Sequence, residues 1–167
     1  MSLDAAPTDE VVGVEASRWH DAVAEALGAG YRWLCLITAW DSSGETVTRR
    51  GGRRATGSAH AAEGPGPDMV VCCRLLDRST GRAVRLETRV SFDDGYRLSS
   101  VRDLLAGAVW YEREVSDQFG ISFDGGDPRR LVIHPDRSGT GPAPLRRSVE
   151  LAARAPGPPG GRERSRR

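Results

Sequence analysis

The sequence predicts an α/β (α+β) fold: a small mixed sheet of three to four strands, two main helices packed on it, and an extended C-terminal segment. Three observations support this fold class. Two long apolar runs and one strictly alternating run supply strands, and two amphipathic stretches supply helices. The elements follow one another as helix, strand, insertion, strand, strand, helix and extended segment. At 167 residues the chain is long enough for one domain with a real core.

The first helix is expected over residues 18–28, after an N-terminal arm at 1–13 that shows no periodic pattern. Ser17 can cap this helix, and Gly28 and Gly30 follow its last apolar residue. Its apolar face is expected to consist of Trp19, Ala22, Val23, Ala26 and Leu27.

Three strands are expected. The run YRWLCLITAW (31–40) is apolar on both faces once Arg32 is set aside, which is typical of a central strand. MVVCCRLLD (69–77) predicts a second buried strand. RAVRLETRV (82–90) alternates between apolar and charged residues, which predicts a half-buried strand, and RSTG before it supplies a hairpin turn.

Between the first two strands the apolar pattern disappears, because the stretch is rich in Gly, Ser and Arg. The expected organisation is a flexible arm at 1–13, a single α/β domain at 14–135 with a mobile insertion at about 42–68, an extended docking segment at 136–151 and a disordered basic tail at 152–167.

The second helix is expected over about 101–118, capped by Ser99 or Ser100 and ended by Gly120. On a helical wheel Leu104, Leu105, Ala108 and Val115 form its core-facing stripe. Glu112 falls in the middle of this stripe. Because an unpaired buried charge is costly, a buried ion pair with Arg129 or Arg130 is expected.

The opposite side of this helix carries Trp110 among charged residues, with Asp103, Glu114 and Asp117 near it and Arg113 to one side. A large aromatic residue on a solvent-facing side is typical of a contact surface. Two interpretations remain open: the chain's own C-terminal segment covers Trp110, or a partner subunit does.

Composition and motifs argue against several other functions. All 24 basic residues are Arg, and the sequence contains no Lys and no Asn, which are encoded by AT-rich codons. The arginines therefore reflect a GC-rich genome more than a nucleic-acid site, and the net charge of +1 gives no overall attraction to nucleic acid. RRGGRR (49–54) and the C-terminal arginines keep an Arg/Gly-rich nucleic-acid-binding module as a distant alternative. Cys35, Cys72 and Cys73 are too few for a four-cysteine iron–sulfur cluster.

No catalytic constellation is recognisable. The carboxylates of Glu112, Glu114 and Asp117 project to different sides of the expected helix, and His20, His60 and His134 are scattered along the chain. The acidic N-terminus lacks an apolar signal segment, and no uncharged apolar run could span a bilayer, so a soluble cytoplasmic protein is expected.

The second helix and the residues after it resemble the signature of the 30-kilodalton subunit family of complex I, the NADH-quinone oxidoreductase, as a divergent bacterial member. The signature joins Ala-x-Trp-x-Glu-Arg-Glu to Asp-x-Phe-Gly-Ile-x-Phe, followed by Gly, an Arg pair and an aliphatic residue. The matching residues are Ala108, Trp110, Glu112, Arg113, Glu114, Asp117, Phe119, Gly120, Ile121, Phe123, Gly125, Arg129, Arg130 and Leu131, and farther on Pro144, Leu145, Arg146 and Arg147.

This resemblance implies a non-catalytic subunit of the peripheral arm of a proton-pumping NADH:quinone oxidoreductase, on the cytoplasmic side of the cell membrane. It implies that the chain braces the quinone-site (49-kilodalton-type) subunit and a cluster-carrying neighbour. NADH, FMN, the iron–sulfur clusters and quinone would belong to partner subunits, and membrane contact would be made only through the complex. The expected interface or structural residues are Trp110, Glu112, Arg113, Glu114, Asp117, Phe119, Gly120, Phe123, Arg129, Arg130 and Arg146.

The chain departs from the family pattern at Gly125-Gly126-Asp127-Pro128, which is shorter than the family's Gly-His-Pro-Asp-Leu and lacks its His. Docking is therefore the property in which this chain is expected to differ from its relatives. The equivalent brace subunit of a membrane-bound hydrogenase-type complex remains an alternative host.

Overall fold

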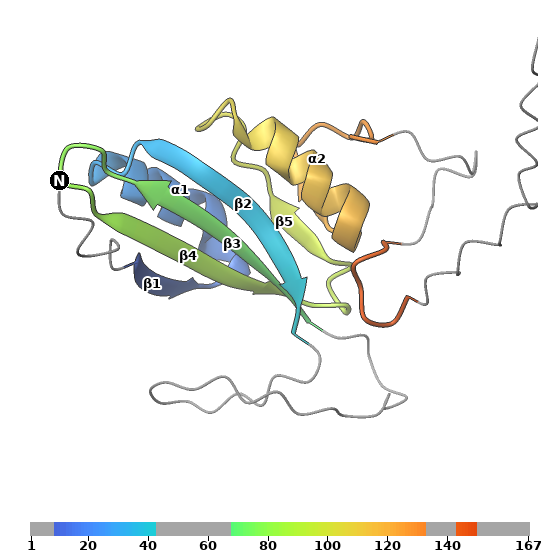
Figure 1. The fold of residues 1–167 in the computed structure, drawn as a ribbon. Coiled ribbons are helices and arrows are strands. Elements are labelled where there is room, and N and C mark those ends of the chain that lie inside the picture. Colours follow the sequence, from blue (N-terminus) through green and yellow to red (C-terminus); the bar gives the residue numbers. More distant parts are fainter. Residues whose placement is uncertain (1–8, 43–67, 133–142, 150–167) are drawn as a thin grey trace, which may run out of the picture.

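The computed structural model describes residues 9–42, 68–132 and 143–149. Its elements are β1 (Asp9–Val14), a 3₁₀ turn η1 (Ala16–Arg18), α1 (Trp19–Gly28), β2 (Trp33–Asp41), β3 (Met69–Leu76), β4 (Ala83–Val90), β5 (Arg97–Ser99), α2 (Ala108–Phe119) and β6 (Ser122–Asp124). Figure 1 shows a four-stranded sheet with α1 behind it and α2 running along β2. The predicted α+β class is confirmed.

The sheet has the order β1-β4-β3-β2, with β1 parallel to β4 and the other pairs antiparallel. Two predictions are wrong here. Residues 9–13 are not part of a flexible arm, because they belong to the edge strand β1. β2 is the other edge strand, not a central one. α2 packs along this edge strand, and the Tyr111 hydroxyl donates to the Cys35 carbonyl, 3.1 Å away.

The core lies between one face of the sheet and the two helices. Met69, Val71, Cys73 and Leu75 of β3 all point into it. Trp19, Val23 and Ala26 of α1 are buried there, as the apolar face predicts. Ser17 does not cap α1, since it lies in η1 and makes no side-chain capping bond.

β3 and β4 form the predicted hairpin, and every second residue of β4 is buried. The Asp77 carboxylate accepts from the Ser79 amide and from the Ser79 and Thr80 hydroxyls, which closes the turn. The Ser42 amide donates to the Asp68 carbonyl at 3.1 Å, so the chain leaves and re-enters the sheet at neighbouring points. The expected insertion between them lies outside the described residues, as does the expected basic tail.

α2 begins at Ala108 and not at 101, so the predicted start of this helix is wrong. Residues 101–107 form separate turns, in which Leu104 and Leu105 bond back to the Val101 carbonyl. Neither Ser99 nor Ser100 caps α2, because Ser99 lies in β5 and the Ser100 hydroxyl bonds to Glu112. Gly120 ends the helix as predicted, with a φ of 68° that favours glycine.

Candidate subunit interface

The buried carboxylate of Glu112 joins α2 to the segment that follows β5. Its side chain is 2% exposed, as its place in the apolar stripe predicts. The Ser100 hydroxyl donates to it at 2.7 Å and the Val101 amide at 2.8 Å. The predicted ion pair with Arg129 or Arg130 is therefore wrong: two neutral donors satisfy the carboxylate. Burial raises the pKa of Glu112, and the two hydrogen bonds only partly offset that rise.

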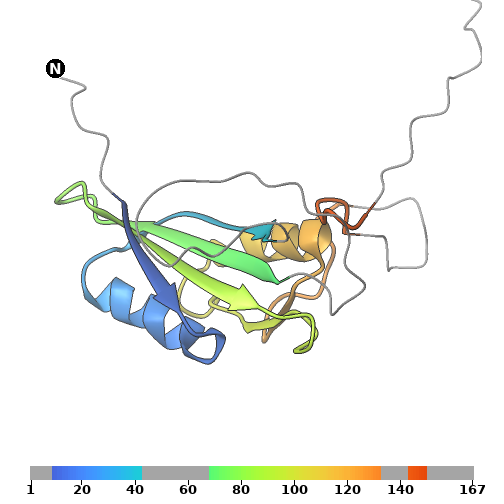
Figure 2. The ribbon, with the colours of Figure 1, turned by 90° about the horizontal axis from the view of Figure 1, so that it is seen from below.

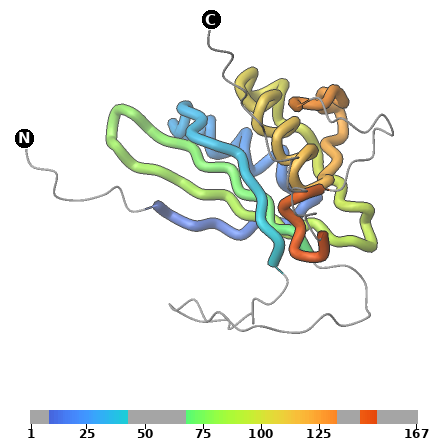
Figure 3. Tube along the Cα trace, turned by 45° about the vertical axis from the view of Figure 1, so that its right-hand side comes forward, coloured from blue at the N-terminus to red at the C-terminus, as the bar shows by residue number. Residues whose placement is uncertain are grey.

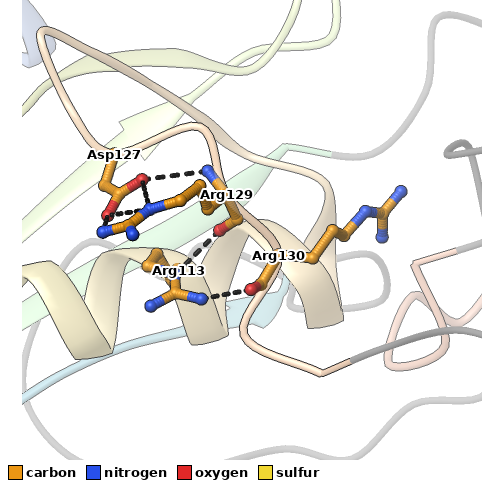
Figure 4. A network of polar contacts seen from close by, with 4 residues as sticks. All are labelled: Arg113, Asp127, Arg129 and Arg130. Atoms are coloured by element: carbon orange, nitrogen blue, oxygen red, sulfur yellow. Dashed lines mark hydrogen bonds and ion pairs between the residues drawn. The ribbon is translucent and has the colours of Figure 1, made fainter.

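Two residues one turn apart on α2 hold the segment 129–132 by its backbone. The Arg113 guanidinium donates to the Arg129 carbonyl at 2.8 Å and also to the Arg130 carbonyl (Figure 4). The Asp117 carboxylate accepts hydrogen bonds from the amides of Leu131 and Val132, at 2.9 and 3.0 Å. The segment has no sheet partner, so these side chains take the place of a strand.

Asp117 was expected on the outward side of the helix, and that prediction is wrong. Its side chain is 3% exposed and forms an ion pair with Arg130, with 3.5 Å between Oδ1 and Nη1. The helical wheel treats the face away from the sheet as solvent. Here the segment 129–132 covers that face and needs an acceptor for its amides.

Asp127 fixes the turn that leads into this segment. Its carboxylate accepts from the Arg129 amide at 3.0 Å and from the Arg129 guanidinium at 2.6 to 3.0 Å (Figure 4). These contacts hold the pKa of Asp127 well below its usual range. The turn therefore keeps its shape, and it leaves the Arg129 side chain 78% exposed.

The C-terminal end of α2 is closed by a segment from much later in the chain. Arg146 Nε donates to the Phe119 carbonyl at 2.6 Å, and Arg146 Nη2 donates to the Gly120 carbonyl at 3.3 Å. The same guanidinium lies 4.3 Å from the centre of the Tyr96 ring. The Arg147 amide bonds to the Asp41 carboxylate at 2.9 Å. Residues 143–149 thus join the ends of α2 and β2 (Figure 3).

The outward side chains around α2 form a patch, which we call the α2 patch: Trp110, Arg113, Arg129, Arg130 and Val132. Trp110 is 63% exposed, and the Arg113 guanidinium lies 5.3 Å from the centre of its ring. Val132 is also largely exposed. Exposed Trp and Arg side chains on a rigid backbone are typical of the anchors of protein interfaces. Next to the patch, a pocket of about 280 Å³ opens between α2 and residues 120–130.

Two of the three cysteines are buried in β3. Burial raises the pKa of Cys72 to about 11 and that of Cys73 to about 12, so both thiols stay protonated at neutral pH. Within residues 9–42, 68–132 and 143–149, no three His, Cys, Asp or Glu side chains are grouped as metal ligands would be. No helix in those ranges is long and apolar enough to cross a membrane.

The chain matches the model of one known protein family. The family model described as "Respiratory-chain NADH dehydrogenase, 30 Kd subunit" matches residues 12–155. The chain belongs to this family. The matched range includes α2, the turn at Asp127 and Arg146, and therefore the whole α2 patch.

Known members are similar at moderate identity. NAD(P)H-quinone oxidoreductase subunit J of Prochlorococcus marinus (strain MIT 9303) is 31% identical over 147 residues, which are 78% of this chain and 68% of the relative. An NADH-quinone oxidoreductase subunit of Verminephrobacter eiseniae (strain EF01-2) is 41% identical over 68 residues, or 41% of this chain and 34% of that protein. The second match therefore spans about a third of the relative's length.

Two solved structures share the fold. A trypsin-resistant fragment (1–134) of Nqo5 aligns with a TM-score of 0.52 and 24% identity, covering 70% of this chain and 80% of the fragment. A chain of the membrane-bound sulfane sulfur reductase, an archaeal respiratory membrane complex, aligns with a TM-score of 0.63 and 20% identity, covering 88% of this chain and 76% of that one. At these identities the likeness concerns the fold alone.

The structure brings most of the expected interface residues together around α2. Glu114 is exposed on the helix, and Phe123 is half-buried against the core. Sequence reasoning missed Ser100 and Asp127. Asp127 precedes a proline and an Arg pair, a pattern typical of an Asx turn that could have revealed it. Ser100 had no such signal, because its role depends on where Glu112 lies in space.

Proposed function

We propose that this chain is a non-catalytic structural subunit of the peripheral arm of a proton-pumping NADH:quinone oxidoreductase, on the cytoplasmic side of the membrane. It braces the quinone-site subunit and a cluster-carrying neighbour. In this proposal NADH, FMN, the iron–sulfur clusters and quinone are bound by the partner subunits. Membership of the 30 Kd subunit family and relatives named as quinone oxidoreductase subunits support it.

The observation that carries the proposal is how α2 uses its polar side chains. Glu112, Arg113 and Asp117 each bond to backbone groups or hydroxyls of neighbouring segments. These side chains therefore fix the positions of backbone segments. A docking surface requires such fixed positions, whereas a general acid or base must be able to exchange a proton with a substrate. The α2 patch that results is rigid, aromatic and basic.

A rigid brace matters to electron transfer even though it carries no electron. Electron transfer between clusters falls steeply with their separation, so a subunit that fixes the distances between partners controls the rate of the whole chain. The patch supplies a Trp and several Arg side chains for such a contact, and these are the residue types that most often dominate interface energies.

A deletion experiment tests the proposal. We expect that membranes lacking this chain lose the assembled peripheral arm and the NADH:quinone reductase activity, and that the wild-type chain restores both. Trp110→Ala should restore much less, whereas Phe92→Ala, which removes another largely exposed aromatic from the turn after β4, should restore both. Normal assembly and activity without the chain would refute the proposal.

The host complex has a second candidate. The alternative is that the chain is the equivalent brace of a membrane-bound hydrogenase-type assembly; a chain of another respiratory membrane complex, an archaeal sulfane sulfur reductase, shares the fold. The two differ in the large subunit that they brace. Mass spectrometry of the proteins that co-purify with this chain distinguishes them, since only the first host contains a flavin subunit that oxidises NADH.

A further inference from the structure

One face of the four-stranded sheet carries no helix or strand of the described residues. Figure 2 shows α1 on one side of the sheet and no helix on the other. The residues of β3 that alternate with the core residues point to this open face. We call the face formed by these and their paired neighbours the open face: Trp33, Leu36, Thr38 and Trp40 of β2, Val70, Cys72, Arg74 and Leu76 of β3, Ala83, Arg85, Glu87 and Arg89 of β4, and Asp9, Val11 and Gly13 of β1.

The part of the open face over β2 and β3 is more apolar than a solvated sheet surface requires, whereas the β4 residues Arg85, Glu87 and Arg89 are charged. Val11 and Trp33 are 50% and 53% exposed, and Trp40 is half-buried beside a hollow of about 480 Å³. Antiparallel sheets that face water on one side normally alternate apolar residues inward with polar residues outward. Two tryptophans on the outward side are typical of a contact surface.

A basic site marks one end of the open face, where β2 begins and the hairpin of β3 and β4 turns. The Arg78 guanidinium lies 4.8 Å from the centre of the Trp33 ring. Arg32, Trp33 and Arg78 line one hollow of about 420 Å³. In the described part of the chain, no carboxylate lies within ion-pair distance of either arginine.

Among the described residues that line this hollow, Asp77 alone carries a carboxylate, and that carboxylate already accepts hydrogen bonds within the turn. Asp77 accepts three hydrogen bonds from Ser79 and Thr80, which lower its pKa to about 2. It is therefore ionised at neutral pH, and its oxygens face the turn. The two arginines and this carboxylate leave a positive charge beside an exposed indole ring.

The remaining charges on the open face are largely paired. Arg74 forms two hydrogen bonds of 2.8 Å with Asp9, and Arg85 lies 2.9 Å from Glu87. Arg89 donates to the Ser42 hydroxyl at 3.2 Å. Arg74 and Arg85 are therefore balanced by carboxylates, and the positive charge that no carboxylate of the described residues balances lies at Arg32 and Arg78 at one end of the face and at Arg89 toward Trp40.

We propose that the open face is a second docking surface, which takes an acidic segment of a partner subunit. An Asp or Glu side chain of that segment lies between Arg32 and Arg78, and its apolar residues cover Trp33 and the strip toward Trp40. This inference rests on the proposed function, because a brace needs a second surface in addition to the α2 patch. Charge complementarity selects this occupant.

Other occupants fit less well. In its described part, a second copy of this chain offers no acidic patch to Arg32 and Arg78, because the carboxylates of Asp9 and Glu87 on its open face are already paired with arginines. An anionic lipid surface would meet the carboxylates of Asp9 and Glu87 on the same face. An acidic segment meets the unpaired arginines at one end and the apolar strip beyond them.

Photocrosslinking in the assembled complex tests the proposal. Benzoylphenylalanine replaces Trp33 in one variant and Trp110 in another, and the crosslinked peptides are identified by mass spectrometry. We expect both positions to crosslink to partner subunits, and the segment captured at 33 to be rich in Asp and Glu. The double variant R32E/R78E should reduce co-purification of the captured subunit by about tenfold, in a salt-dependent manner.

Arg18→Glu is the matched control, because Arg18 is an exposed arginine of η1, away from the open face. It should leave co-purification unchanged. Capture of a second copy of this chain, of lipid, or of no partner at 33 would overturn the inference, and if position 110 still crosslinks, the proposed function stands. If the chain joins no complex at all, the proposed function fails, and this inference fails with it.

Discussion

Glu112 sets the position of α2 against the rest of the fold, and its variants test that role. Glu112→Ala leaves the Ser100 hydroxyl and the Val101 amide without a partner in a buried site. We expect it to lower the free energy of unfolding by about 2–4 kcal/mol. Glu112→Gln keeps an acceptor and the side-chain volume, so its loss should be less than half as large. Urea unfolding measures both, and equal losses would contradict this role.

The same residue predicts a pH dependence. Because burial raises the pKa of Glu112, the folded state binds its proton more tightly than the unfolded state does. The free energy of unfolding should therefore fall as pH rises from the ordinary value of about 4.5 through the pKa of the folded state. Glu112→Gln should lack this decrease. A parallel pH profile in the two proteins would show that Glu112 is not the titrating group.

Arg146 stabilises α2 from a distance in the sequence. Its guanidinium bonds to two carbonyls at the helix end and packs on Tyr96. We expect Arg146→Ala to lower the free energy of unfolding by about 1–3 kcal/mol, and Arg146→Lys to recover only part of it, because an ammonium lacks the planar fork. Thermal unfolding measures the order. Full recovery by Lys would mean that charge alone matters.

At the scale of elements, α2 and the segment 129–132 depend on Asp117. Asp117→Ala removes the acceptor of the Leu131 and Val132 amides. We expect these two amides to exchange with deuterium at least about tenfold faster, while the core strands β3 and β4 keep their protection. Glu114→Ala, on the exposed side of the helix, is the control and should change neither. Unchanged exchange at both amides would contradict the role given to Asp117.

The edge strand β1 is held to the sheet by the pair of Asp9 with Arg74, in addition to its parallel pairing with β4. The hydrogen bond from Arg74 lowers the pKa of Asp9. The stabilisation is therefore present above the ordinary carboxyl pKa and is lost as pH falls through the lowered value of the folded state. Asp9→Asn should cost about 1 kcal/mol at pH 7 and much less at pH 2 to 3, measured by urea unfolding.

Glu10→Gln is the matched control for that experiment. Glu10 is an exposed neighbour in β1, and the nearest nitrogen of Arg82 is 3.8 Å from its carboxylate. We expect little change in stability from this substitution at any pH. A cost as large as that of Asp9→Asn would show that general charge, and not the bonds to Arg74, holds the strand.

The elements that could be predicted from the sequence are those whose patterns are local. β3, β4 and their hairpin follow from alternation and a turn, and the buried Glu112 follows from helical periodicity. The sequence did not predict β1, because this strand is short and pairs in parallel with β4, which lies far away in the sequence. The start of α2 was placed too early, because the turns at 101–107 continue the apolar spacing of the helix.

The partners of polar side chains could not be predicted in the same way. Glu112 bonds to residues 100–101 in place of the expected arginine, and Asp117 is buried where an exposed side chain was expected. In both cases a segment outside the helix supplies the amide donor. A helical wheel represents one helix against one core. It holds no information on which loop covers the remaining side, and that information decided most of the site.

At the scale of the whole molecule, the two proposals give the protein two contact surfaces: the α2 patch and the open face of the sheet. Each combines an exposed Trp with a stacked Arg, at 5.3 Å for Trp110 and 4.8 Å for Trp33. α2 packs along β2, and the segment 143–149 bonds to the ends of both elements, so one folded unit carries the two surfaces. Such a body suits a protein that sets the distance between two neighbours.

The most direct measurement is purification of the tagged full chain from membranes in mild detergent, followed by mass spectrometry of the bound proteins. We predict that the wild-type chain brings down the quinone-site subunit and a cluster-carrying subunit of an NADH:quinone oxidoreductase. Trp110→Ala, with an unchanged melting temperature, should lose at least about nine-tenths of them. Recovery of the chain alone, or of the same partners in the same amounts with Trp110→Ala, would contradict the bracing role.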